Sequence, residues 1–171
     1  HDNVGACKEL VTVLFAKGIQ NIAYLGSNMD QMVNRCRYQG YEEAYRKGKR
    51  KLNQDLVYTD LSSRAMVEKA VEELKNSGVE CILCQDDYIC DEVVRKLARM
   101  GVRIPDQMKV ASCHYSRILE NYPITITSLK FNITELGRRS CQVLLDMIHG
   151  KTVPDKTLLD YEIILKESTK G

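Results

Sequence analysis

Apolar residues follow two patterns that alternate along the chain. Short apolar runs bounded by polar residues or glycine predict β-strands, and longer segments with apolar residues three and four positions apart predict amphipathic helices. Strands and helices alternate with short connections, which is typical of an α/β protein with a doubly wound, mostly parallel sheet. The predicted helices cover about residues 2–17, 30–49, 63–77, 87–100 and 133–149, and the predicted strands cover about 22–25, 56–58, 79–84, 110–113, 124–129 and 158–165.

The clearest unit of the chain runs from residue 79 to residue 116. Its first apolar run stops at Asp86 and Asp87, a helical segment follows as far as Gly101, and its second apolar run stops at His114. This order is one βαβ unit with polar groups where each strand ends. Because ligands of open parallel sheets bind outside the carboxyl ends of the strands, the unit predicts a binding site. Of the two acids, we expect one to face a ligand and the other to begin the helix.

Composition and motifs exclude several classes of protein. The chain has 171 residues and a net charge of +2, so it can form one domain with a core, and its charge selects neither nucleic acid nor membrane. No apolar run is long enough to span a membrane. The chain has no G-x-G-x-x-G, P-loop or nucleophile-elbow motif, which argues against dinucleotide enzymes, P-loop enzymes and serine hydrolases.

Seven cysteines are scattered without a disulfide framework, which favours a reducing compartment, the cytoplasm. Cys81 and Cys84 have the spacing of a metal or redox motif, but residues three apart on a strand point to opposite faces. We therefore expect buried thiols, no metal and no cofactor. The basic run from Arg46 to Lys51 ends a predicted helix, where cations are favoured, and no aromatic residues interleave with it, so we interpret it as solvated surface.

Arg37 is the most interesting cation of the second predicted helix. It lies in R-C-R-Y-Q-G-Y-E-E-A (35–44), after the first predicted strand. A guanidinium offers a planar fork of donors that suits vicinal hydroxyls, a carboxylate or a phosphate. Taken alone, a surface ion pair with Asp or Glu would explain this arginine equally well.

Six segments, in one order, resemble the effector-binding domain of LacI/GalR-type bacterial transcriptional regulators. Each segment alone is only weakly similar to the family, but the order and spacing of all six are specific. They are D-N (2–3) opening a helix that ends L-F-A-K-G-I-Q-N-I-A-Y-L-G, R-Y-Q-G-Y-E-E-A (37–44), D-D-Y-I-C-D-E-V-V-R-K-L-A-R-M-G-V-R-I-P-D-Q-M-K-V-A-S (86–112), P-I-T-I-T-S-L (123–129), E-L-G-R-R-S-C-Q-V-L-L-D-M-I-H-G-K (135–151) and E-I-I-L-K-E-S (162–168).

This resemblance implies a type I periplasmic-binding-protein-like fold, in which two lobes are hinged around a small ligand. It implies that residues 3–129 and 157–166 form the C-terminal lobe, nearly complete, and that the helix within 130–150 belongs to the N-terminal lobe. The rest of that lobe and the DNA-binding headpiece are expected to be absent from this chain. An amphipathic helix without its partner lobe exposes an apolar stripe, so we expect it to pair with a second copy.

The resemblance also assigns effector contacts by position. Arg37 lies at the position of the family's ligand-binding arginine. Asp86 lies where the family often has a polar residue that contacts the effector, and Asp87 begins the next helix. Asn28 or Asp60 completes the expected half of the cleft.

Two positions depart from the family's pattern. His114 stands where an aspartate is usual, and Asp60 or its neighbour Leu61 stands where an aromatic ring often stacks on a sugar. The loss of that carboxylate and that ring argues against a simple hexose. A histidine can instead favour an anionic effector or respond to pH.

The expected function is a cytoplasmic, ligand-responsive transcriptional regulator, specifically a repressor, with no enzymatic step. Its effector would be a sugar or a related polar metabolite, its operator DNA would be bound through the headpiece, it would form a homodimer, and it would not bind membranes. One alternative is a solute-binding protein of an ABC transporter, which shares the fold, although seven cysteines disfavour an oxidising periplasm. A second alternative is an α/β enzyme with Asp86 and His114 as an acid/base pair.

Overall fold

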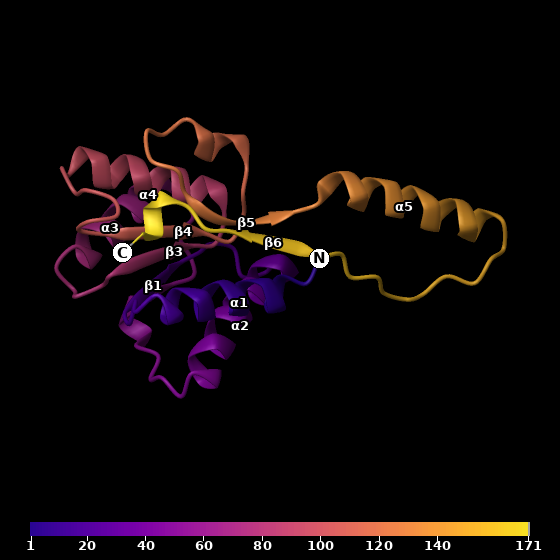
Figure 1. The fold of residues 1–171 in the computed structure, drawn as a ribbon, viewed down its shortest axis with the longest axis horizontal. Coiled ribbons are helices and arrows are strands. Elements are labelled where there is room, and N and C mark those ends of the chain that lie inside the picture. Colours follow the sequence, from indigo (N-terminus) through magenta and orange to yellow (C-terminus); the bar gives the residue numbers. More distant parts are fainter. Residues whose placement is uncertain (171) are drawn as a thin grey trace.

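A six-stranded sheet with helices on both faces forms the body of the molecule, and an arm leaves it at one end (Figure 1). The computed structural model describes residues 1–170. The strand order is β2-β1-β3-β4-β5-β6, and all pairs are parallel except β5 with β6. The predicted doubly wound, mostly parallel sheet is therefore confirmed. The strands are β1 (Ile22–Leu25), β2 (Val57–Tyr58), β3 (Cys81–Cys84), β4 (Lys109–Ser112), β5 (Thr127–Phe131) and β6 (Tyr161–Ile164), and the helices are α1 (Asn3–Ala16), α2 (Met32–Lys47), α3 (Arg64–Leu74), α4 (Asp87–Arg99) and α5 (Ile133–Ile148).

Two apolar cores lie on opposite faces of the sheet. Helices α1 and α2 cover one face, with Leu10, Leu14 and Tyr41 in its core, and α3 and α4 cover the other. Strands β1 and β3 are buried along their whole length, as expected for parallel strands covered on both sides. Cys81 belongs to the first core and Cys84 to the second, so the two sulfurs face away from each other, as predicted.

Helices α1 and α2 pack closely at Gly40. A Cβ atom at this position would lie 2.4 Å from the carbonyl oxygen of Val4 and 2.9 Å from the Cβ of Cys7. Only glycine lets the two backbones approach this far. This contact sets the position of α2, which carries Arg37.

The strand predicted at 124–129 lies instead at Thr127–Phe131. The backbone of Thr125 hydrogen-bonds to the C-terminal segment: its N–H donates to Glu167 at 3.1 Å, and the N–H of Ser168 donates to its carbonyl at 3.0 Å. The apolar alternation of 124–126 places Ile126 in the core under α3 and α4, with Ile124 packed against it, and not in the ladder with β4.

The strand predicted at 158–165 is shorter than expected because its partner ends. β6 pairs with β5 from Ser128↔Ile164 to Phe131↔Tyr161, and Asn132 then caps α5 through a bond from the backbone N–H of Glu135. Residues 132–160 form the arm, which consists of α5 and the segment that returns to the body (Figure 1).

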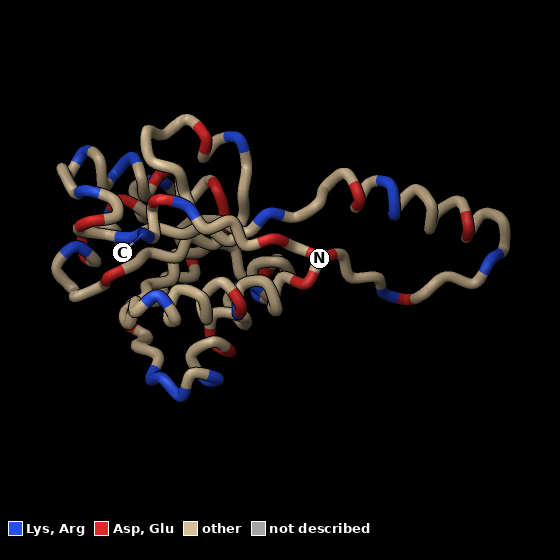
Figure 2. Tube along the Cα trace, in the orientation of Figure 1, with Lys and Arg blue, Asp and Glu red and all other residues tan. Residues whose placement is uncertain are grey.

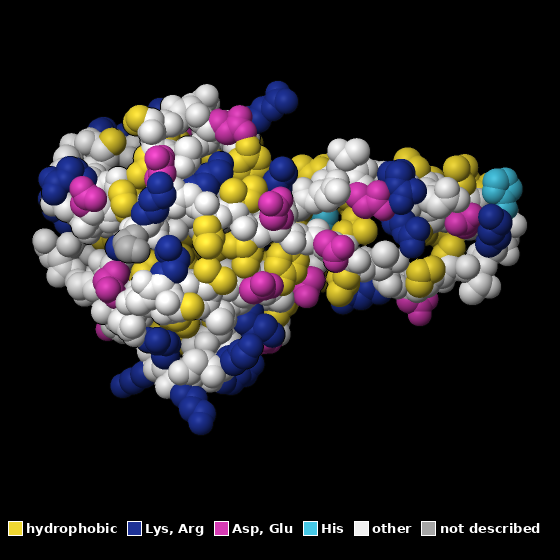
Figure 3. Space-filling view, viewed as in Figure 1, with side chains coloured by type: hydrophobic (Ala, Val, Ile, Leu, Met, Phe, Trp, Pro, Cys, Tyr) yellow, Lys and Arg dark blue, Asp and Glu magenta, His cyan; other side chains and the backbone are white. Residues whose placement is uncertain are grey.

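Helix α5 forms where it was predicted, but none of its residues is buried. Apolar side chains gather along the arm in the space-filling view (Figure 3). The large exposed ones on α5 are Ile133, Leu136, Leu144, Leu145, Met147 and Ile148, with exposed fractions from 40% to 69%. This helix therefore carries an apolar stripe that the described residues do not cover.

The basic run from Arg46 to Lys51 lies at the last turn of α2 and in the loop that follows (Figure 2). It is at the opposite end of α2 from the carboxyl ends of the strands. Among residues 1–170, no helix is long and apolar enough to cross a membrane.

Replacing Gly40 is expected to destabilise this chain. In Gly40→Ala, the new Cβ meets backbone atoms of α1 that cannot rotate away, so we expect the free energy of unfolding to fall by about 1–3 kcal/mol. Urea denaturation measures this change. Gly137→Ala is the matched control, since a Cβ there meets no atom within 4 Å. Replacing a mid-helix glycine by alanine should raise the free energy of unfolding by up to about 1 kcal/mol. Equal stability of Gly40→Ala and the parent chain would contradict the packing described.

Candidate functional site

A depression of about 460 Å³ lies at the carboxyl ends of the central strands. Leu25, Cys84 and Ser112 are in register across β1, β3 and β4, so the residues that follow these strands meet at one edge. Four predicted contacts, Arg37, Asp86, His114 and Asn28, lie together here. The full lining is Ser27, Asn28, Gln31, Val33, Asn34, Arg37, Asp86, Asp87, Tyr88 and His114. The volume suits a small-molecule ligand.

The fifth predicted contact, Asp60, is not brought to this site. It is exposed in the loop after β2 and is not among the residues that line the depression. Its neighbour Leu61 is buried in the core under α3 and α4, and its backbone N–H donates to the Gly26 carbonyl at 3.0 Å. Neither residue therefore lines the depression.

Gln85 joins the ends of β1 and β3 behind the depression. Its side chain is fully buried; Oε1 accepts from the backbone N–H of Ser27 at 3.2 Å, and Nε2 donates to the Ser27 carbonyl at 3.1 Å. A Cβ on Gly26 would lie 2.5 Å from Oε1, so the amide occupies the space beside this glycine. Gln85 is a positioning residue that fixes the loop after β1.

Arg37 reaches the site from the second turn of α2. Its Nη1 donates to the backbone carbonyl of Gln85 at 3.0 Å, and only 9% of the residue is exposed. Its Nε is buried and has no hydrogen-bond partner among residues 1–170. A buried donor without a partner is costly, which marks this atom as one that a ligand or water would satisfy.

The loop after β1 presents Asn28 in a left-handed conformation, with φ of 45°. Asparagine tolerates this region better than most residues. The Asn34 side chain holds the loop by donating to the carbonyls of Ser27 and Asn28 at 2.9 and 3.0 Å. These bonds fix the backbone of the loop from which Asn28 lines the depression.

Asp86 and Asp87 both line the depression, with different local roles. Asp86 is the N-cap of α4, and its Oδ1 accepts from the backbone N–H of Ile89 at 2.9 Å. Asp87 is the first residue of the helix, as predicted; it is buried, and its carboxylate makes no hydrogen bond within the described chain. Two carboxylates and the guanidinium of Arg37 therefore line the same depression.

His114 follows β4 and is held by its own backbone. Its N–H donates to the Ser112 hydroxyl at 3.2 Å, and that hydroxyl donates to the His114 carbonyl at 2.7 Å. Burial lowers the pKa of the imidazole, the Asp87 carboxylate raises it to a smaller extent, and Arg37 lowers it. Nδ1 is buried without a partner among the described residues. Burial thus favours the uncharged form of the His114 imidazole.

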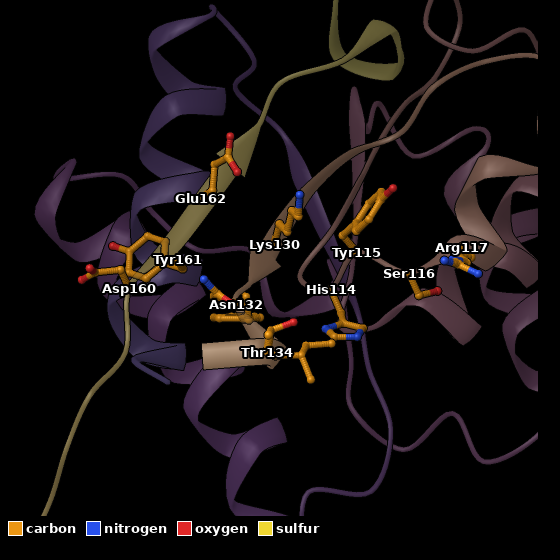
Figure 4. A pocket seen from close by; sticks show the side chains of 12 residues that line it. His114, Tyr115, Ser116, Arg117, Lys130, Asn132, Thr134, Asp160, Tyr161 and Glu162 are labelled. Carbon is orange, nitrogen blue, oxygen red and sulfur yellow. The ribbon is translucent and has the colours of Figure 1, made fainter. Parts of the chain in front are cut away.

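His114 also lines a second depression of about 720 Å³, where the chain enters and leaves the arm. In Figure 4, Asn132 and Thr134 are seen between His114 and Asp160. The ring of His114 stacks on Phe131, the last residue of β5, with centroids 6.3 Å apart. The two depressions are thus neighbours that share one side chain.

The chemistry available at the site is hydrogen bonding to a polar molecule. Within residues 1–170, no three His, Cys, Asp or Glu side chains converge as metal ligands. The thiols of Cys7 and Cys113 lie 3.5 Å apart, but both are fully buried, and the hydrogen bond between them raises the pKa of Cys7. Neither is available as a thiolate nucleophile.

Asp87, Tyr88, Asn34 and Gln85 were not predicted as parts of the site. Asn34 lies three residues before Arg37, so the helical period could have placed it on the same face. Gln85 directly follows a fully apolar strand, and that position was a usable signal. Nothing in the local pattern reveals that Tyr88 faces the depression.

Residues 11–169 match the family described as "Periplasmic binding protein-like domain". Among curated proteins, the chain is similar to the HTH-type transcriptional regulator CelR of Thermobifida fusca, with 26% identity over 170 residues, covering 98% of this chain and 50% of that protein. The chain spans about half the length of the curated relatives it matches.

Solved structures share the fold of this chain. The structure of the transcription regulator CcpA of Lactococcus lactis superposes with a TM-score of 0.88 at 24% identity, covering 99% of this chain and 63% of that one. A complex of the transcriptional regulator CelR with cellobiose superposes with a TM-score of 0.84 at 26% identity, covering 98% of this chain and 52% of that one.

The pKa of His114 is expected to lie below the ordinary value of about 6.5, because burial disfavours the imidazolium. Asp87→Asn should lower it further, since the carboxylate of Asp87 raises it. Because the folded state takes up this proton less readily than the unfolded state, the contribution of His114 to stability is complete above about pH 6.5 and declines as the pH falls.

NMR titration of the imidazole C–H signals measures the pKa of His114, and the variant His114→Asn assigns these signals. The control is Asp106→Asn, at an exposed carboxylate paired with Arg103. Titration at or above 6.5 in the parent chain would refute the assignment.

Proposed function

Because this chain belongs to the family of periplasmic binding protein-like domains, we propose that it forms one wall of the effector cleft of a bacterial transcriptional repressor. The observation that carries the proposal is the convergence of Arg37, Asp86, Asp87 and His114 at the carboxyl ends of the central strands. The unpartnered nitrogens of Arg37 and His114 support a polar ligand there. The matching relatives are named as HTH-type transcriptional regulators or repressors.

The effector is a sugar or a related polar metabolite without a net negative charge. A guanidinium and two carboxylates together can donate to and accept from neighbouring hydroxyls. Two carboxylates against one guanidinium, with an uncharged imidazole, disfavour a phosphate or a carboxylic acid. The relative CelR, solved with cellobiose, supports a saccharide.

The whole protein, of which this chain would be about half, binds operator DNA through a separate helix-turn-helix headpiece and acts as a homodimer in the cytoplasm. Effector binding changes the affinity for DNA, which is a coupling between two sites. No enzymatic step belongs to this function. A solute-binding role in an ABC transporter is not favoured, since the matching relatives are named as regulators.

In this proposal, helix α5, within residues 130–150, belongs to the N-terminal lobe, and residues 3–129 and 157–166 form the C-terminal lobe. The exposed apolar stripe of α5 supports this division, because an amphipathic helix is stable when its apolar face is covered. In the whole protein, the other lobe would cover this stripe.

The function is tested with the full-length protein and genomic DNA fragments selected by binding. We expect a neutral saccharide to change the affinity for DNA in a mobility-shift assay. Arg37→Ala should keep DNA binding but weaken saccharide binding at least about tenfold by calorimetry, because it removes a buried, charged donor. Arg103→Ala, at an exposed arginine paired with Asp106, is the matched control. The proposal would be contradicted if the full-length protein bound no DNA, or if no ligand changed its affinity for DNA.

The division of the chain is tested at Leu144, which is 58% exposed on α5. Leu144→Ala should leave the 171-residue chain within about 0.5 kcal/mol of the parent, as for a surface residue. In the full-length protein it should cost about 2–5 kcal/mol, because the side chain would then be buried. Gln142→Ala, on the same helix, should have little effect on the free energy of unfolding of either protein. Equal effects of Leu144→Ala in the two proteins would show that the other half does not cover α5.

A further inference from the structure

Tyr88 is the most exposed tyrosine of the described chain, with 72% of its surface accessible, and it lines the same depression as Arg37, Asp86 and His114. We infer that the Tyr88 ring is the surface on which the apolar face of a neutral sugar ring stacks. This inference rests on the proposed function and adds to it a residue that determines which ligands fit.

The other tyrosines of residues 1–170 differ from Tyr88 in two ways. Each is at least partly buried, and every one except Tyr38 has a hydroxyl with a hydrogen-bond partner: Tyr24 bonds Gln85, Tyr41 and Tyr45 bond the Ile22 carbonyl, and Tyr58, Tyr115, Tyr122 and Tyr161 bond Glu73, Glu120, Asp91 and Glu9. The Tyr38 ring packs against those of Tyr24 and Tyr41. The Tyr88 hydroxyl makes no hydrogen bond within the described chain, so neither core packing nor a structural bond accounts for its position.

The start of α4 fixes where the ring points. The Asp86 cap holds the first turn, and Ile89 and Cys90 are buried in the core on the sheet side of the helix. Tyr88, one residue earlier, therefore lies off the buried stripe, above the depression. The ring is carried by a rigid helix terminus and not by a loop.

The rest of the lining explains why an apolar surface is needed. Apart from Tyr88, Val33 is the one apolar side chain in a lining dominated by amide, hydroxyl and charged groups. A pyranose offers hydroxyls around its edge and C–H groups on its faces. Arg37, Asp86 and Asp87 suit the hydroxyls, and an aromatic ring suits the C–H face, as binding sites generally combine a few polar groups with apolar contact. Asp60 and Leu61 do not provide such a ring.

Calorimetry on the full-length protein, with cellobiose and a panel of neutral mono- and disaccharides as probes, tests the inference. For the saccharide that binds, Tyr88→Ala should weaken affinity about fivefold to tenfold, and Tyr88→Phe should stay within about threefold, because the ring and not the hydroxyl makes the contact. The melting temperature without ligand should not change, since the ring is exposed.

Met32→Ala is the matched control. Met32 is also 72% exposed and begins α2 at the same edge of the sheet, but it does not line the depression, so its removal should leave affinity unchanged. In Tyr88→Trp, the added fluorescence should change when the saccharide binds; this chain has no tryptophan of its own, and the signal of the parent protein is subtracted.

The outcomes separate the two proposals. If a saccharide binds and Tyr88→Ala binds it as tightly as the parent, the role of Tyr88 is overturned and the proposed function stands. If Tyr88→Phe loses as much affinity as Tyr88→Ala, the hydroxyl and not the ring makes the contact, and stacking is overturned. If no saccharide of the panel binds the parent protein, the sugar effector itself is overturned, together with this role.

Discussion

The buried amide of Gln85 is the contact on which the candidate site depends. Parallel strands end side by side, but the sheet does not fix the loops that follow them. Gln85 supplies this constraint in two ways. Its side chain hydrogen-bonds to both the N–H and the carbonyl of Ser27, and its backbone carbonyl accepts a hydrogen bond from Arg37. A buried amide that loses a partner is costly, so these bonds favour one arrangement of β1, β3 and α2. The glycine at position 26 follows from the same contact, since a side chain there would displace the amide.

Much of the fold follows from apolar periodicity, and the parts that do not follow depend on long-range partners. In α4, Ile89, Val93, Val94 and Leu97 are buried as the helical spacing predicts, and the resemblance to LacI/GalR-type effector-binding domains is confirmed. Residues 124–126 alternate like a strand, yet they bind the C-terminal segment some forty residues away. A local sequence pattern cannot predict this contact, because its partner segment is far away in the sequence. The same holds for β6, whose length is set by where β5 ends.

The site was predictable where topology alone places a residue. Asp86 and His114 follow from the rule that ligands bind at strand ends, whereas Arg37 and Asn28 needed the resemblance in addition. Asp60 does not join the other predicted contacts, because the loop after β2 turns Leu61 into the core and leaves Asp60 outside the depression. Tyr88 was missed because the predicted apolar stripe of α4 shows only that residue 88 lies off the buried face, and not which loops form the depression beside it.

The rings beside the site connect it to the arm. His114 stacks on Phe131, where β5 ends, and Phe131 packs edge-on against Tyr161, where β6 begins, with centroids 6.3 and 6.4 Å apart. These two strands are the connections through which the chain enters and leaves the arm. A ligand can bias the orientation of two parts only through groups whose contacts differ between the orientations. His114 lines the depression, and its ring also stacks on Phe131, where the chain enters the arm. The imidazole therefore contributes both to the lining of the depression and to the packing where the chain enters the arm.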